Sequence, residues 1–85
     1  MYLIILVKYI IIKKKFEKAL EYYDKALDLE TDNVIILNNK ALVLCKLNRL
    51  ENSLGYYNKT LKLDSDNEYA LEGREEVLKK IKNND

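Results

Sequence analysis

Apolar residues recur every three or four positions through most of this chain, and that spacing places them on one face of a helix. The clearest run lies between Val34 and Leu47, with apolar side chains at Leu37, Ala41 and Leu44. A second run follows at Leu50, Leu54, Tyr57, Leu61 and Leu63. Only Asn48 and Arg49 separate the two runs. A break this short allows nothing but a tight turn, so we predict two antiparallel helices that form a hairpin.

The pattern repeats at an interval of 34 residues. Segments 22–33 and 56–67 are identical at seven of their twelve positions. The same offset predicts an earlier hairpin, whose two helices carry Leu3, Val7 and Ile10, then Phe16, Leu20, Tyr23 and Leu27. We expect Thr31–Asp32 and Ser65–Asp66 to cap the helices that follow them by accepting free backbone N–H groups. A repeat of this length is typical of stacked helical units that bury their apolar faces only against their neighbours.

The pattern begins a third time after Asn67, with apolar residues at Leu71, Leu78 and Ile81. Glu75 stands where the second hairpin has the small residue Ala41, and most of the remaining positions of this helix are charged. A polar outer face is what the terminal helix of a stacked array requires. We therefore predict a lone capping helix at the carboxyl end.

Composition argues against catalysis and against a general attraction to nucleic acid. The 85 residues include 15 basic and 14 acidic side chains, which gives a formal net charge of +1. Histidine is absent and Cys45 is the single cysteine, which leaves no metal-ligand cluster, no thiol–imidazole pair and no disulfide within the chain. We therefore expect no enzyme activity, no cofactor and no metal. A lone thiol fits a reducing compartment, and we expect a cytoplasmic protein.

The 34-residue hairpin resembles a tetratricopeptide repeat in its order of large and small residues. In the second repeat the family's large places hold Leu37, Leu44 and Tyr57, and its small places hold Ala41, Ser53 and Thr60. The first repeat matches at Leu3, Ile10, Ala19, Tyr23 and Ala26. There are three departures. The family's usual proline after the second helix is replaced by Thr31 and Ser65, its turn glycine by Lys14 and Asn48, and the small residue of the first helix by Val7.

The resemblance implies an all-α fold, a right-handed superhelix of two 34-residue hairpins followed by a C-terminal capping helix. Residues 1–85 would form one domain, with repeat 1 at about 1–32, repeat 2 at about 33–66 and the capping helix at about 67–83. It also implies a concave groove that receives a peptide or a segment of another protein. The implied groove residues are Lys8, Ile11, Ile12, Ile35, Asn38, Asn39, Leu42, Cys45, Lys46 and Tyr69.

Within this groove Asn38 and Asn39 are the strongest candidates, because amides can hydrogen-bond a peptide backbone. Some family members clamp the terminal carboxylate of chaperone tails. Of the equivalent places in this sequence only Asn39 has the right chemistry, so we do not expect that function. We expect Cys45 to be structural, since no neighbouring base would lower its pKa. The paired tyrosines at 22–23 and 56–57 are expected to pack between helices rather than to stack on bases.

The first twelve residues are the compositional outlier, apolar apart from Lys8 and followed by Lys13–Lys15. The run is shorter than the roughly 20 residues of a membrane span, and a secretory signal would carry its charges before the apolar stretch. Three hypotheses remain open. The helix self-associates, giving a homo-oligomer with Tyr2, Ile5 and Leu6 near the contact; the chain is a piece of a longer array; or residues 1–12 anchor a membrane-associated adaptor.

We expect the lysines at 13–15 to be solvated rather than to bind nucleic acid, because three lysines at the end of a helix also favour solubility and the helix dipole. The main expectation from the sequence is therefore a non-enzymatic module whose partner is a protein or a peptide.

Overall fold

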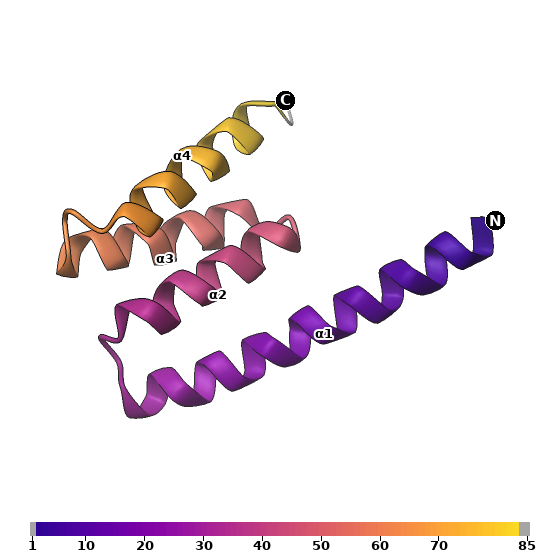
Figure 1. Ribbon diagram of the computed structural model, residues 1–85, viewed down its shortest axis with the longest axis horizontal. Coiled ribbons are helices and arrows are strands. Elements are labelled where there is room, and N and C mark those ends of the chain that lie inside the picture. The colour runs from indigo at the N-terminus through magenta and orange to yellow at the C-terminus, as the bar shows by residue number, and fades with distance from the viewer. Residues whose placement is uncertain (1, 84–85) are drawn as a thin grey trace.

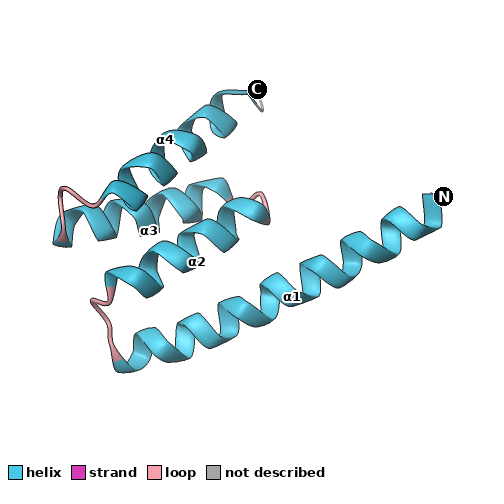
Figure 2. Cartoon of the chain, in the orientation of Figure 1, coloured by secondary structure: helices cyan, strands magenta, loops and turns pink. Residues whose placement is uncertain are grey.

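The computed structural model describes residues 2–83, and side chains from residue 3 to residue 83. Four helices account for most of this part of the chain: α1 (Tyr2–Leu29), α2 (Val34–Lys46), α3 (Leu50–Leu63) and α4 (Glu68–Asn83). The described residues contain no strand (Figure 2). Helix α2 is central and packs against each of the other three helices (Figure 1). The predicted all-α class is confirmed, and the packing is that expected of stacked helical hairpins.

Helices α2 and α3 form the predicted hairpin, and the residues that suggested it make its core. All six large and small positions of the second repeat are buried: Leu37, Ala41, Leu44, Ser53, Tyr57 and Thr60. The Ser53 hydroxyl donates a hydrogen bond of 2.6 Å to the backbone carbonyl of Ala41. This bond requires the two helices to approach closely, and small side chains at both positions permit that approach. The Ser53–Ala41 pair therefore defines the register of the hairpin.

The turn between α2 and α3 depends on the backbone of Asn48, which has a positive φ of 61°. Its N–H donates to the carbonyl of Cys45, and the N–H of Arg49 donates to that of Leu44 at 2.8 Å. This pair of bonds is the Schellman motif, which ends a helix through one residue in the left-handed conformation. Asparagine adopts that conformation more readily than most residues other than glycine.

Helix α1 departs from the predicted arrangement. The sequence predicts a turn near Lys14, but residues 2–29 form one continuous helix. Lys14 stands 34 residues before Asn48, where the turn would need a positive φ. That conformation costs an ordinary residue about 1–2 kcal/mol, whereas lysine is a good helix former. The helix therefore runs on, and the three lysines at 13–15 lie in its middle rather than at its end as predicted.

The two junctions before α2 and α4 have the same geometry. Before α2, the Asn33 side-chain oxygen accepts from the N–H groups of Ile35 (3.0 Å) and Ile36 (3.1 Å), and its amide donates to Glu30. Before α4, the Asn67 oxygen accepts from the N–H of Ala70 at 3.0 Å. The predicted caps at 31–32 and 65–66 are thus corrected by one position, because asparagine closes each repeat and its short amide reaches the first turn.

The core has two parts that share α2. One joins α2, α3 and α4 through buried residues that include Ala41, Tyr57 and Val77. The other joins α1 to α2 around Leu20, Val43 and Leu44. Helix α1 contributes to this second cluster only from Phe16 onward, and its first half extends away from the other helices in Figure 1. Only the second half of α1 is therefore integrated into the fold.

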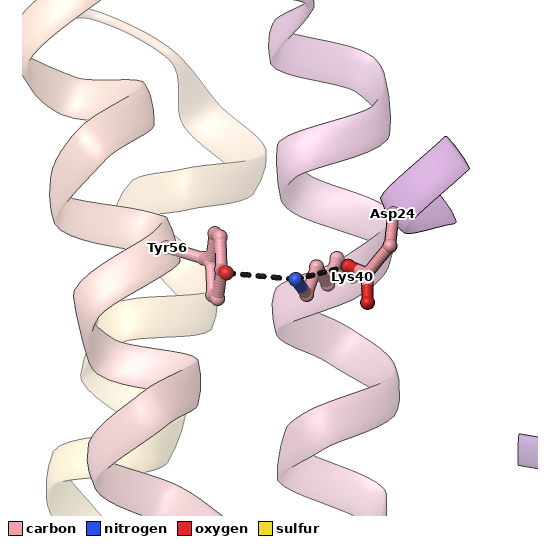
Figure 3. Close-up of polar contacts among 3 residues, drawn as sticks. All are labelled: Asp24, Lys40 and Tyr56. Atoms are coloured by element: carbon pink, nitrogen blue, oxygen red, sulfur yellow. Dashed lines mark hydrogen bonds and ion pairs between the residues drawn. The ribbon is translucent and has the colours of Figure 1, made fainter. Parts of the chain in front are cut away.

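A polar contact at Lys40 links three helices. The Lys40 ammonium group forms an ion pair with Asp24 of α1 and donates a 2.7 Å hydrogen bond to the Tyr56 hydroxyl of α3 (Figure 3). Burial lowers the pKa of Lys40, but the hydrogen bonds to Asp24 and Tyr56 outweigh it, and the pKa lies above the ordinary value of 10.5. A second ion pair joins Arg49 to Glu17. These contacts fix the second half of α1 beside α2.

Candidate functional site

A groove of about 700 Å³ lies on the face where α2 and α4 meet. Its walls come from both helices, from Tyr57 of α3 and from the junction that precedes α4. The lining residues are Ile35, Asn38, Asn39, Leu42, Tyr57, Asn67, Tyr69, Glu72, Gly73 and Glu76. A hollow of this volume falls within the range of small-molecule and peptide side-chain sites.

Three large apolar side chains give the groove its apolar character. Ile35 and Leu42 come from α2, and Tyr69 comes from the first turn of α4. All three are exposed, Tyr69 to 79% of its surface and Ile35 to 69%. By contrast, Leu37 and Leu44 of the same helix are buried. Apolar side chains gathered at one concave surface are typical of an interaction site.

The amide of Asn38 lies deep in the groove and is only half satisfied. Its Nδ2 donates a 3.0 Å hydrogen bond to Oδ1 of Asn67, which also accepts from the first turn of α4. Its own Oδ1 is buried and has no hydrogen-bond partner among the described residues. Asn39 is exposed beside it. An unsatisfied buried acceptor costs folding free energy. Because this oxygen is buried, a ligand in the groove does not reach it in this conformation.

Two carboxylates stand on the α4 wall of the groove. Glu72 and Glu76 are both exposed and both line it. Neither residue was among the groove residues expected from the sequence. The signal was present, because Tyr69, Glu72 and Glu76 follow one another at spacings of three and four and therefore share a helix face. They make the α4 wall of the groove negatively charged.

The floor of the groove is the ring of Tyr57 against Gly73. A Cβ atom added at Gly73 would lie within 3.0 Å of ring atoms of Tyr57. Glycine therefore lets the buried tyrosine reach under α4. Burial also raises the pKa of the Tyr57 hydroxyl above its ordinary value of 10.0, with a smaller contribution from nearby Cys45. The ring is thus packed, as the packing hypothesis expected for this tyrosine. Tyr22, for which packing was also expected, is exposed instead.

The structure brings together five of the residues expected to line a groove: Ile35, Asn38, Asn39, Leu42 and Tyr69. The others lie elsewhere. Cys45 is buried in the core beside Ala41, one helical turn earlier. Lys46 is exposed at the end of α2 and does not line the groove. The three residues from the first repeat, Lys8, Ile11 and Ile12, are exposed on the first half of α1 and are also outside it.

The residues expected at a self-association contact lie on the same exposed part of α1. Ile5 and Leu6 are both exposed, whereas the side chain of Tyr2 lies outside the described residues. A second hollow, of about 330 Å³, is lined by Leu3, Ile4, Val7 and Lys8. Within residues 2–83 no helix has the length and apolar character needed to cross a bilayer.

The comparisons with known proteins give one similarity. The chain is 45% identical over 38 residues to a Dictyostelium discoideum protein, the Protein STIP1 homolog. The matched segment is 45% of this chain, and it spans 7% of the length of that relative. No protein-family model matches the sequence, and no solved structure matches the fold.

Proposed function

We propose that this chain is a non-enzymatic interaction module that binds a peptide or a segment of another protein in the groove between α2 and α4. One observation carries the proposal. Three large apolar side chains, Ile35, Leu42 and Tyr69, are exposed and line the same groove. Burial of apolar surface is the dominant favourable term in most protein–protein association.

The polar part of the groove selects the chemistry of the partner. Glu72 and Glu76 are exposed carboxylates on the α4 wall of the groove, and they carry negative charge. Two carboxylates on one wall favour a ligand that brings N–H donors and positive charge. The partner segment would therefore present an aliphatic or aromatic side chain next to a lysine or an arginine. The positive charge of such a partner segment is opposite in sign to the terminal carboxylate that some tetratricopeptide proteins bind.

Two further observations support a protein partner. The chain resembles the tetratricopeptide family in the order of its large and small residues, and that family supplies peptide-binding grooves. The similarity to the Protein STIP1 homolog extends over 38 residues, which is slightly longer than one 34-residue unit. The cytoplasm, where a lone thiol stays reduced, is the proposed compartment.

Affinity purification of the tagged chain, followed by mass spectrometry, tests this function. We expect a partner that the unaltered chain captures, and that the variants Tyr69→Ala and Leu42→Glu lose. Tyr22→Ala is the matched control, because Tyr22 is exposed on α1 and does not line the groove. Glu72→Gln with Glu76→Gln should weaken capture most at low salt. Capture that survives changes at Tyr69 and Leu42 would contradict the assignment of the groove.

The proposed function includes self-association through the exposed first half of α1. Nine of the ten residues from Leu3 to Ile12 are large and apolar, and all nine are exposed. A helix that is apolar on every side is expected to be buried. Multi-angle light scattering of the purified chain checks this part, and a monomer at every concentration without detergent would contradict it.

A further inference from the structure

The first half of α1 repeats the core positions of α2 but buries none of them. Leu37, Ala41 and Leu44 of α2 are at most 4% exposed, because α2 lies among the other three helices. Ala41 packs in the cluster shared with α3 and α4, and Leu44 packs in the cluster shared with α1. The equivalent residues 34 positions earlier are Leu3, Val7 and Ile10, and they are exposed to 74%, 54% and 51%. The same pattern thus appears once covered by neighbouring helices and once uncovered.

The accessible surface of the chain exceeds that of a compact monomer by enough to accommodate a partner. A compact monomer of 10.0 kDa would expose about 5,200 Å², whereas this chain exposes 6520 Å². The excess of roughly 1,300 Å² is larger than the roughly 800 Å² that each partner buries in a standard interface. The radius of gyration, 14.0 Å, also exceeds the roughly 12 Å of a compact chain of this length.

The chain cannot readily supply the cover itself. Folding back would need a left-handed residue at position 14, as Asn48 provides between α2 and α3. Lys14 disfavours that conformation, and α1 continues through it as a straight helix. A segment that matches an internal partner but cannot turn toward it is the usual starting point for exchange between copies.

We infer that two copies of this chain exchange the first halves of their α1 helices. Residues 3–12 of one copy pack antiparallel on residues 16–27 of the other, as α2 packs on α3, and the same contact forms in reverse about a two-fold axis. Each copy then completes the first hairpin of its partner. This inference rests on the self-association proposed above and names its partner, a second copy, and its geometry.

The second repeat also gives the register of the exchanged pair. Ser53 and Ala41 are in direct contact across the α2–α3 hairpin. Their equivalents 34 residues earlier are Ala19 and Val7, so Val7 of one copy meets Ala19 of the other. Within one straight α1 these two residues are twelve positions and roughly 18 Å apart. A disulfide needs Cα atoms closer than about 7 Å, so a bond between them distinguishes exchange from an extended monomer.

The experiment is cysteine cross-linking in the full 85-residue chain. The variant Val7→Cys with Ala19→Cys is made in a Cys45→Ala background, oxidised, and analysed by non-reducing electrophoresis beside light scattering of the unoxidised protein. We expect a covalent dimer. Val7→Cys with Asp28→Cys is the matched control, because position 28 lies nine residues and roughly 13 Å further along the helix. The control pair should remain largely uncross-linked.

Each result decides the question. A bond within one chain would show that the hairpin closes internally and would overturn exchange. If light scattering shows a dimer but the disulfide between chains does not form, self-association is supported and exchange is overturned. A monomer would overturn both.

A second variant tests the role of the turn. Lys14→Gly removes the penalty on the left-handed conformation and should shift cross-linking from between chains to within one chain, by roughly 5- to 30-fold. Lys18→Gly, with the same loss of helix propensity at a position that needs no turn, should leave the ratio unchanged. If the ratio of cross-linking within one chain to cross-linking between chains is equal in the two variants, the exchange mechanism is overturned.

Discussion

The two glycines offer a matched test of the packing beneath the groove. Gly55 lies inside α3 and Gly73 inside α4, and neither has a positive φ. A Cβ at Gly55 would meet nothing within 4 Å, whereas one at Gly73 would overlap the ring of Tyr57. Replacing glycine by alanine inside a helix normally stabilises it by about 1 kcal/mol. We expect Gly55→Ala to show this gain in full.

The same change at Gly73 should reverse the gain. Overpacking a buried site costs about 1–3 kcal/mol, so Gly73→Ala should range from neutral to destabilised by about 2 kcal/mol. For a domain of this size each kcal/mol moves the midpoint of thermal unfolding by roughly 4–8 °C. Far-UV circular dichroism during heating of both variants and the unaltered chain measures the difference.

A double-mutant cycle assigns the effect to the tyrosine. Tyr57→Leu removes the ring atoms that a Cβ at Gly73 would overlap, so Gly73→Ala should cost less in that background than in the unaltered chain. If Gly55→Ala and Gly73→Ala raise the midpoint by the same amount, then Tyr57 does not pack under α4 as described, and the floor of the groove is misassigned.

Two further predictions concern the caps and the pH dependence of stability. Asn33→Ala should cost about 1 kcal/mol because it removes the cap of α2, whereas Asp32→Ala should change the unfolding free energy by less than about 0.5 kcal/mol; urea unfolding compares them, and equal losses would contradict the assigned cap. The pKa values of Lys40 and Tyr57 are raised in the folded chain above 10.5 and 10.0, so the folded state holds these protons more tightly. Their contribution to stability should be complete below about pH 10 and should be lost as the pH rises through the folded values. Urea unfolding across this range checks it, and stability that increases above pH 10 would contradict the sign.

The second hairpin could be predicted because its evidence is local and redundant. The order of large and small residues predicts which faces meet, and the Ser53–Ala41 contact follows from two small residues opposite each other. The shape of α1 could not be read from the same pattern, since apolar positions at helical spacing look alike in a hairpin and in one long helix. The difference lies in the φ of a single residue, for which Lys14 was the available signal.

The candidate site was predicted in part, for a similar reason. Ile35 and Leu42 were implied by the resemblance to the tetratricopeptide family, and both are exposed on α2. Cys45 was wrongly expected to line the groove. It follows Leu42 by three residues and buried Ala41 by four, so its helical position fits either face, and its side chain lies in the core. In the sequence, Glu72 and Glu76 look like ordinary surface charge. Only the packing of α4 on α2 places them in the groove.

The junctions that end at Asn33 and Asn67 have a consequence for how the chain could grow. Each is closed almost entirely by bonds within its own few residues, and the two loops are the same in geometry. A duplicate of residues 34–67 placed after Asn67 would therefore meet a docking edge like the one that α4 meets now. Chain length in such a protein can change by whole 34-residue units without redesign of the joints, and each added unit would extend the groove by one more wall.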